Sequence, residues 1–170
     1  MSQLVRVGAV AAIVGGVLRI VSTFIAHQAD LAWLEALYAV IDLCLLVGLI
    51  AIYLANADAV GMSGLIAFLV ALAGVASIVG PDTTAFGIDF YRLGALVFVL
   101  GLAGLSAMLL RARIMRAAAS LWIATLLAGL ASSVWPQAFI VSGLCLGAGY
   151  ILAGMTIVPT PAKAASMTST

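Results

Sequence analysis

The stretch WLEALYAVIDLCLLVGL, residues 33–49, is apolar enough to lie in a membrane, yet it contains two carboxylic acids, Glu35 and Asp42. A helix that crosses a bilayer needs about 20 predominantly apolar residues. An ionisable side chain within such a helix is costly, and it usually faces the interior of the helical bundle. The stretch therefore predicts a membrane fold and, within it, an inward-facing polar site.

The composition of the whole chain agrees with a membrane fold. Of its 170 residues, 66% are hydrophobic and 8% are charged, and the mean hydropathy is +1.32. Typical soluble domains are about 45–50% apolar and about 25% charged. We therefore expect an integral membrane protein in contact with the lipid bilayer. The formal net charge of +1 indicates no basic surface, so we expect no nucleic-acid partner.

Six apolar stretches are long enough to be membrane helices, and short polar or turn-forming segments separate them. They are residues 4–26, 31–55, 62–79, 90–110, 117–135 and 138–158. Because backbone groups in lipid must be paired within their own segment, these stretches are expected to be helical. We predict an all-α fold, a polytopic transmembrane bundle of about six helices. Residues 1–158 are its single domain, and residues 159–170 are a mobile polar tail.

The arginines predict how the bundle is oriented. Arg111, Arg113 and Arg116 lie in or beside the segment between the fourth and fifth stretches. With six crossings, Arg6 and Lys163 fall on the same side as this cluster. Basic residues are enriched on the cytoplasmic side of membrane proteins. We therefore expect both termini in the cytoplasm and the protein in a bacterial inner membrane.

A weak internal repeat has two explanations. ALAGVASIVGP, residues 71–81, matches LLAGLASSVWP, residues 126–136, at seven of eleven positions and a spacing of 55. VGGVLRIVST, residues 14–23, fits the same register with a weaker match. The repeat predicts three successive helical hairpins related as parallel repeats. The alternative is chance, because Ala, Gly, Leu and Val are common in every membrane helix.

Small residues recur four positions apart in three of the apolar stretches. These rows are Ser63, Ala67 and Ala71; Ala124, Ala128 and Ser132; and Gly143 and Gly147. Such rows allow helix backbones to approach closely inside a membrane. They predict tight packing either within the chain or between two copies of it, so a homo-oligomer remains open.

The polar site suggested by the opening stretch is predicted to be catalytic. Glu35, Tyr38 and Asp42 are spaced i, i+3 and i+7, which places them on one face of a helix. Arg19 on the preceding helix has a similar depth, so we expect it to form an ion pair with Glu35 or Asp42. The carboxylic acid left without the arginine is expected to stay protonated and to act as a proton donor.

Four further residues are predicted to bind the substrate together with Arg19. They are Trp33, Tyr91, Arg92 and Trp135, which all fall at the non-cytoplasmic end of the predicted bundle. An alternative for the three aromatic residues is an interfacial belt. An alternative for Arg19, Glu35 and Asp42 is a purely structural ion-pair network. We find no metal-binding or nucleotide-binding pattern, so we expect no metal and no cofactor.

Three functional hypotheses fit these patterns. The preferred one is a membrane-embedded acid–base enzyme of the isomerase or cyclase type that acts on a small lipophilic molecule. The second is a proton-coupled small-molecule transporter, in which Asp42 binds and releases a proton near the middle of the bilayer. The third is a non-catalytic accessory subunit of a larger membrane complex, in which the charges are structural.

Overall fold

A computed structural model describes residues 3–25, 32–79, 84–85 and 88–158. The predicted tail, residues 159–170, lies outside the described residues. The helices and strands, in chain order, are α1 (Gln3–Ser22), α2 (Ala32–Ile78), β1 (Thr84–Ala85), β2 (Ile88–Asp89), α3 (Phe90–Arg111), α4 (Arg116–Ala131) and α5 (Ala138–Ile157). The two strands form a short antiparallel pair. The predicted all-α architecture is confirmed.

The helices also confirm the membrane class of the protein. In the described residues, α1, α2, α3 and α5 are long and apolar enough to cross a membrane. The remaining helix, α4, is apolar but has only 16 residues. The chain is therefore a small integral membrane protein in contact with the lipid bilayer.

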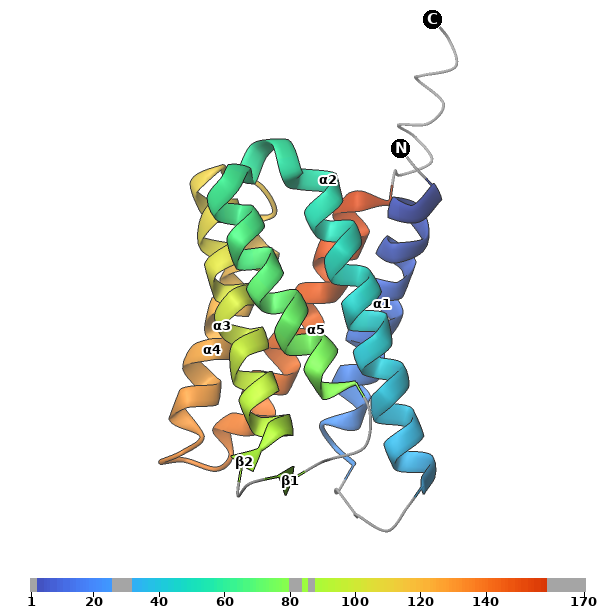
Figure 1. Ribbon diagram of the computed structural model, residues 1–170, viewed down its shortest axis with the longest axis vertical. Coiled ribbons are helices and arrows are strands. Elements are labelled where there is room, and N and C mark those ends of the chain that lie inside the picture. The colour runs from blue at the N-terminus through green and yellow to red at the C-terminus, as the bar shows by residue number, and fades with distance from the viewer. Residues whose placement is uncertain (1–2, 26–31, 80–83, 86–87, 159–170) are drawn as a thin grey trace, which may run out of the picture.

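Helix α2 is folded into two arms at Gly61. Its 47 residues would measure about 70 Å if straight, more than twice the thickness of the hydrocarbon core of a bilayer. Gly61 has φ 60° and ψ −160°, a conformation that is essentially restricted to glycine. Figure 1 shows the chain rising to this end of the bundle and turning back. We call residues 32–60 the first arm and residues 62–78 the second arm.

This turn is tighter than the sequence predicts. The sequence predicts helix ends at residues 55 and 62 with a polar loop between them, but the backbone stays helical up to residue 60. The loop prediction is therefore wrong, because Gly61 leaves the helical conformation and reverses the chain with no separate loop.

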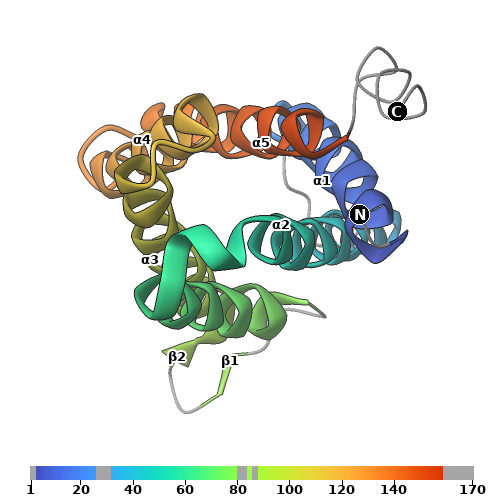
Figure 2. The ribbon, with the colours of Figure 1, turned by 90° about the horizontal axis from the view of Figure 1, so that it is seen from above.

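The five helices of the described residues pack against one another in a ring. α1 packs against α2 and α5, α4 packs against α3 and α5, and α3 packs against α2. Seen from above in Figure 2, α1, α2, α3, α4 and α5 follow one another around this ring. The chain enters α1 and leaves α5 at the same end of the bundle (Figure 1). We call this the terminal end, and we call the end that holds β1 and β2 the strand end.

Glycines and alanines allow the closest helix contacts. A Cβ atom added to Gly101 of α3 would meet the backbone nitrogen of Ala71 in α2. A Cβ atom added to Gly147 of α5 would meet the backbone oxygen of Gly16 in α1. Ala71 and Gly147 belong to the rows of small residues found in the sequence. Both therefore pack within the chain.

The repeated segments share a local hydrogen bond. The hydroxyl groups of Ser22, Ser77 and Ser132 each donate to the carbonyl oxygen three residues earlier, at distances of 3.0, 2.8 and 2.6 Å. These serines are spaced 55 residues apart, the same spacing as the sequence repeat. Ser22 is the last residue of α1, Ser77 is the next-to-last residue of α2, and Ser132 follows the last residue of α4. All three of these helix ends lie at the strand end of the bundle. The repeat thus has a matching feature in the structure.

Candidate functional site

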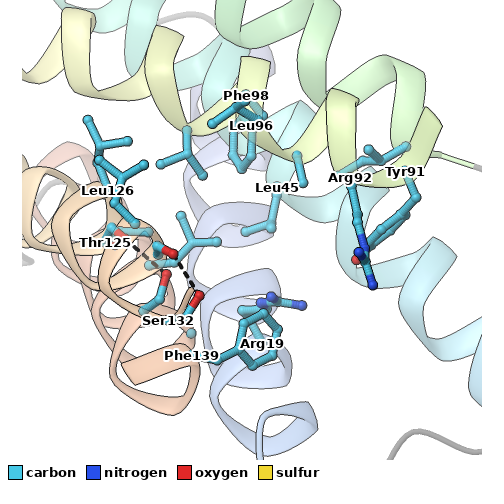
Figure 3. Close-up of a pocket in the computed structure, with 18 of the residues that line it drawn as sticks. Arg19, Leu45, Tyr91, Arg92, Leu96, Phe98, Thr125, Leu126, Ser132 and Phe139 are labelled. Atoms are coloured by element: carbon cyan, nitrogen blue, oxygen red, sulfur yellow. Dashed lines mark hydrogen bonds between the residues drawn. The ribbon is translucent and has the colours of Figure 1, made fainter. Parts of the chain in front are cut away.

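A cavity of about 580 Å³ lies inside the bundle in its strand-end half (Figure 3). Every helix contributes to its lining, including both arms of α2. Most of the lining is apolar, and the larger side chains include Leu45, Leu96, Phe98, Leu126, Phe139 and Leu146. Small-molecule sites in proteins usually have volumes of about 300–1,000 Å³ and mostly apolar walls. The cavity therefore has the size and character of a site for a small lipophilic molecule.

Three serine hydroxyl groups that line the cavity donate their protons to backbone carbonyl oxygens. The hydroxyl of Ser132 donates to the carbonyl oxygen of Gly129 at 2.6 Å, and that of Ser133 donates to Leu130 at 2.7 Å. Ser142 of α5 donates to the carbonyl oxygen of Thr125 in α4 at 3.0 Å. All three serines line the cavity. Since a hydroxyl oxygen keeps lone pairs after donating its proton, these groups can still accept hydrogen bonds.

Asp42 is the acidic side chain of the cavity within the described residues. It lies in the first arm of α2, it lines the cavity, and only 5% of it is exposed. It interacts electrostatically with Tyr150 of α5, a fully buried residue. The hydroxyl group of Tyr150 has no hydrogen-bond partner among the described residues. The structure thus places a carboxyl group and a phenol together inside an apolar interior.

Arg19 lies at nearly the same depth as Asp42. Along the antiparallel contact of α1 with α2, Gly8 faces Ala51 and Gly15 faces Cys44. Continued in this register, Arg19 faces residue 40, which is two residues from Asp42, or about 3 Å along the helix axis. Both side chains line the cavity. The depth of Arg19 is therefore close to the one that its sequence position predicts.

The predicted ion pair of Arg19 with Glu35 or Asp42 stays a prediction. Glu35 is exposed, whereas Asp42 is buried and takes part in an interaction within the protein. The Nε atom of Arg19 is buried and has no hydrogen-bond partner. Positions along two helices fix the depth of their side chains, whereas an ion pair also depends on the rotation of each helix about its axis.

A second arginine, Arg92, lies where the cavity reaches the surface. Arg92 lies in the first turn of α3 and lines the cavity, and its side chain is 87% exposed. Its Nε atom is 3.0 Å from Oδ2 of Asp89. Asp89 also caps α3, since its Oδ1 accepts a hydrogen bond from the backbone nitrogen of Arg92 at 3.0 Å. The side chain and the backbone of Arg92 are therefore both bound by Asp89, the N-terminal cap of its own helix.

The structure brings together only some of the predicted site residues. Arg19, Asp42, Tyr91 and Arg92 line the cavity. The other four predicted residues are not among the described lining residues: Glu35, Trp33 and Trp135 are exposed, and Tyr38 is half-buried against the apolar core. Catalytic roles for Glu35 and Tyr38, and binding roles for Trp33 and Trp135, stay predictions.

Several residues of the site were not found from the sequence. Thr125 and Ser142 reach the cavity from two different helices, and Tyr150 lies close to Asp42. A polar side chain within an apolar helix was the signal that identified Asp42, and Tyr150 carries the same signal in residues 138–157. Thr125 and Ser142 carry a weaker one, because Ser and Thr can satisfy their hydroxyl groups on their own helix anywhere in a membrane.

Comparison of the chain with protein-family models, with curated proteins and with solved structures finds no match. A function must in any case be argued from a site and its chemistry, because one fold can host many functions. The function of this chain is therefore inferred from the cavity and its charged lining residues.

Proposed function

We propose that this integral membrane protein binds a small lipophilic molecule in the cavity and transforms it by acid–base chemistry. Asp42 is the group that exchanges a proton with the bound molecule. The observation that carries this proposal is a buried carboxyl group lining a largely apolar cavity of about 580 Å³. Carboxyl groups in apolar pockets serve as general acids in enzymes.

The proposed reaction is an isomerisation or cyclisation. In its protonated form, Asp42 transfers a proton to an alkene carbon or an epoxide oxygen, and the substrate becomes a carbocation. The carboxylate that remains stabilises this cation and later removes a proton from another carbon, which restores the acid. The proton balance closes without a cofactor. Tyr150 supports the proposal, since its buried hydroxyl group is available to stabilise the carboxylate form of Asp42.

Asp42→Asn tests this proposal. The change keeps the size and shape of the side chain but removes the carboxyl group that could exchange a proton. We expect turnover to fall at least about 100-fold, the lower end of what general acid–base catalysis contributes. Lipophilic molecules extracted from the purified wild-type protein provide the substrate candidates, and mass spectrometry before and after incubation measures their conversion.

A matched control is available on the same helix. Asp58 lies in the first arm of α2, it is exposed, and it is near the terminal end, far from the cavity. Asp58→Asn should leave conversion unchanged. If the protein with Asp42→Asn converts the extracted molecule at the wild-type rate, the acid–base role of Asp42 is wrong.

The same variant separates the other two hypotheses. In a proton-coupled carrier, Asp42→Asn would make transport insensitive to pH. Carriers commonly interrupt their helices beside the binding site, whereas α2 is interrupted at Gly61, at the end of the bundle opposite the cavity. In an accessory subunit, the variant would leave the activity of the partner complex intact. The position of the interruption makes the enzyme the better-supported proposal.

The proposal includes a topology of six crossings in three helical hairpins, with both termini in the cytoplasm of a bacterial cell. It is supported by Arg6, Arg111 and Arg116, which lie at the terminal end of the bundle. After Cys44 and Cys145 are replaced by serine, a single cysteine is introduced for labelling with a membrane-impermeant maleimide. In intact spheroplasts, we expect labelling of Trp135→Cys at the strand end and none of Ser166→Cys in the tail. The reverse pattern would invert the topology.

A further inference from the structure

We infer that the molecule bound in the cavity carries an anionic head group, a carboxylate or a phosphate, and that Arg19 binds this group. The inference rests on the proposed function, because it specifies the class of molecule that the same cavity accepts. It concerns the head group, and its test does not require Asp42 to be the catalytic acid.

The unpaired donor on Arg19 is the first observation. Its Nε atom is buried without a hydrogen-bond partner, and the side chain lines the cavity. A guanidinium group remains charged in proteins and has five N–H donors. Leaving a charged N–H donor buried and unpaired costs free energy, which an oxyanion bound in the cavity would offset with a charge-assisted hydrogen bond.

Neighbouring polar groups do not take up this donor. The hydroxyl groups of Ser22 and Thr23 both donate to the backbone oxygen of Arg19, at 3.0 and 2.8 Å, so they bond its main chain. Ser132, another residue that lines the cavity, donates to Gly129. None of these three hydroxyl groups is bonded to Nε of Arg19, whose side chain lines the cavity.

Arg92 provides a second positive charge. In Figure 3, the side chains of Arg19 and Arg92 enter the pocket from different sides, one from α1 and the other from α3. The ion pair with Asp89 involves Nε of Arg92, so the other N–H groups of its guanidinium remain able to bind an anion entering from the surface. Arg19 lies farther inside the bundle than Arg92, which is exposed.

The charges of the cavity favour an anion under the proposed mechanism. The charge of Arg92 is balanced by Asp89, and Arg19 and Asp42 line the same cavity. When Asp42 is protonated, as the proposed acid must be before it reacts, it carries no charge that could balance Arg19. An anionic head group at Arg19 restores neutrality, and its apolar chain lies against the apolar wall that includes Leu45, Phe98 and Leu146.

Three probes of equal chain length test the head group directly. Dodecanoate, dodecyl phosphate and dodecan-1-ol, each with a photoreactive diazirine in the chain, are added to the full-length protein in nanodiscs of zwitterionic phosphatidylcholine. Peptide mass spectrometry locates the crosslinks, and titration gives the apparent affinity. We expect at least one anion to label lining residues such as Phe98 or Leu146 and to bind at least about ten-fold more tightly than the alcohol.

Two variants test the role of Arg19. Arg19→Gln should reduce the affinity for the anion to that for the alcohol, and Arg19→Lys should retain part of the preference. Arg111→Gln is the control, because Arg111 is exposed at the opposite end of α3. Its affinity for all three probes should equal that of the wild-type protein.

The outcomes separate this inference from the proposed function. If wild-type protein binds alcohol and anions equally in the cavity, the anionic head group is wrong, while binding of a lipophilic molecule stands. If Arg19→Gln weakens alcohol and anion binding alike, Arg19 maintains the cavity and does not bind the head group. If none of the probes labels the cavity, both proposals are wrong. The wild-type comparison remains decisive even if an Arg19 variant fails to fold.

Discussion

Replacing Gly101 with alanine is expected to disrupt the contact between α2 and α3. A Cβ atom at this position would overlap the backbone of Ala71, which cannot move aside as a flexible side chain would. The helices would have to separate along a contact that also includes Gly74, where an added Cβ would meet the backbone of Phe98. Overpacking typically costs about 1–3 kcal/mol, and we expect at least the upper value here.

Gly104→Ala is the matched control for this prediction. It lies on the same helix less than one turn from Gly101, and its added Cβ would meet the Cβ of Ala67 at 3.2 Å. A small shift relieves a contact of this length. Unfolding in mixed detergent micelles gives the two free energies of unfolding. Equal values for the two variants would show that α2 and α3 pack less closely than described.

Removing the indole of Trp122 should also destabilise the bundle strongly. Trp122 is fully buried, and its ring meets Tyr150 edge to face with the ring centroids 5.4 Å apart. Gly149 leaves room for the indole, since a Cβ there would overlap it. Truncation of a buried Trp to Ala costs about 3–5 kcal/mol in soluble proteins. We expect about 3 kcal/mol, because lipid favours apolar side chains in the unfolded state too.

Trp135→Ala is the control, because Trp135 lies at the strand end and is 61% exposed. Its free energy of unfolding should stay within about 0.5 kcal/mol of the wild-type value. Trp122→Ala also opens space beside Tyr150, so we expect it to alter the binding of lipophilic molecules in the cavity. If both tryptophan variants have the same stability, Trp122 is not part of the packed core.

The helical segments could be predicted from the sequence because their cause is local. A run of apolar residues in lipid must pair its own backbone groups, and the helix does this without any contribution from neighbours. Residues 138–158 were predicted as a helix, and α5 covers Ala138–Ile157. Gly61 was the exception, because a single glycine with a positive φ replaced the expected loop.

The candidate site could be predicted only in part. Asp42 was expected to face the interior because a carboxyl group is costly in lipid, and it lies in the cavity. The same argument placed Glu35 beside it, yet Glu35 is exposed. It belongs to the first turn of α2, at the end of the bundle, where neighbouring helices no longer cover every face.

The sequence by itself determined the membrane class, the helical segments and the inward position of Asp42, since each depends on the cost of placing polar groups in lipid. The tertiary structure decided which side chains meet. Arg19 and Asp42 have nearly equal depths on neighbouring helices, and the packing of those helices brings both side chains to one cavity. Thr125, Ser142 and Tyr150 join the site through the packing of α4 and α5, and such long-range contacts are not encoded in any local pattern.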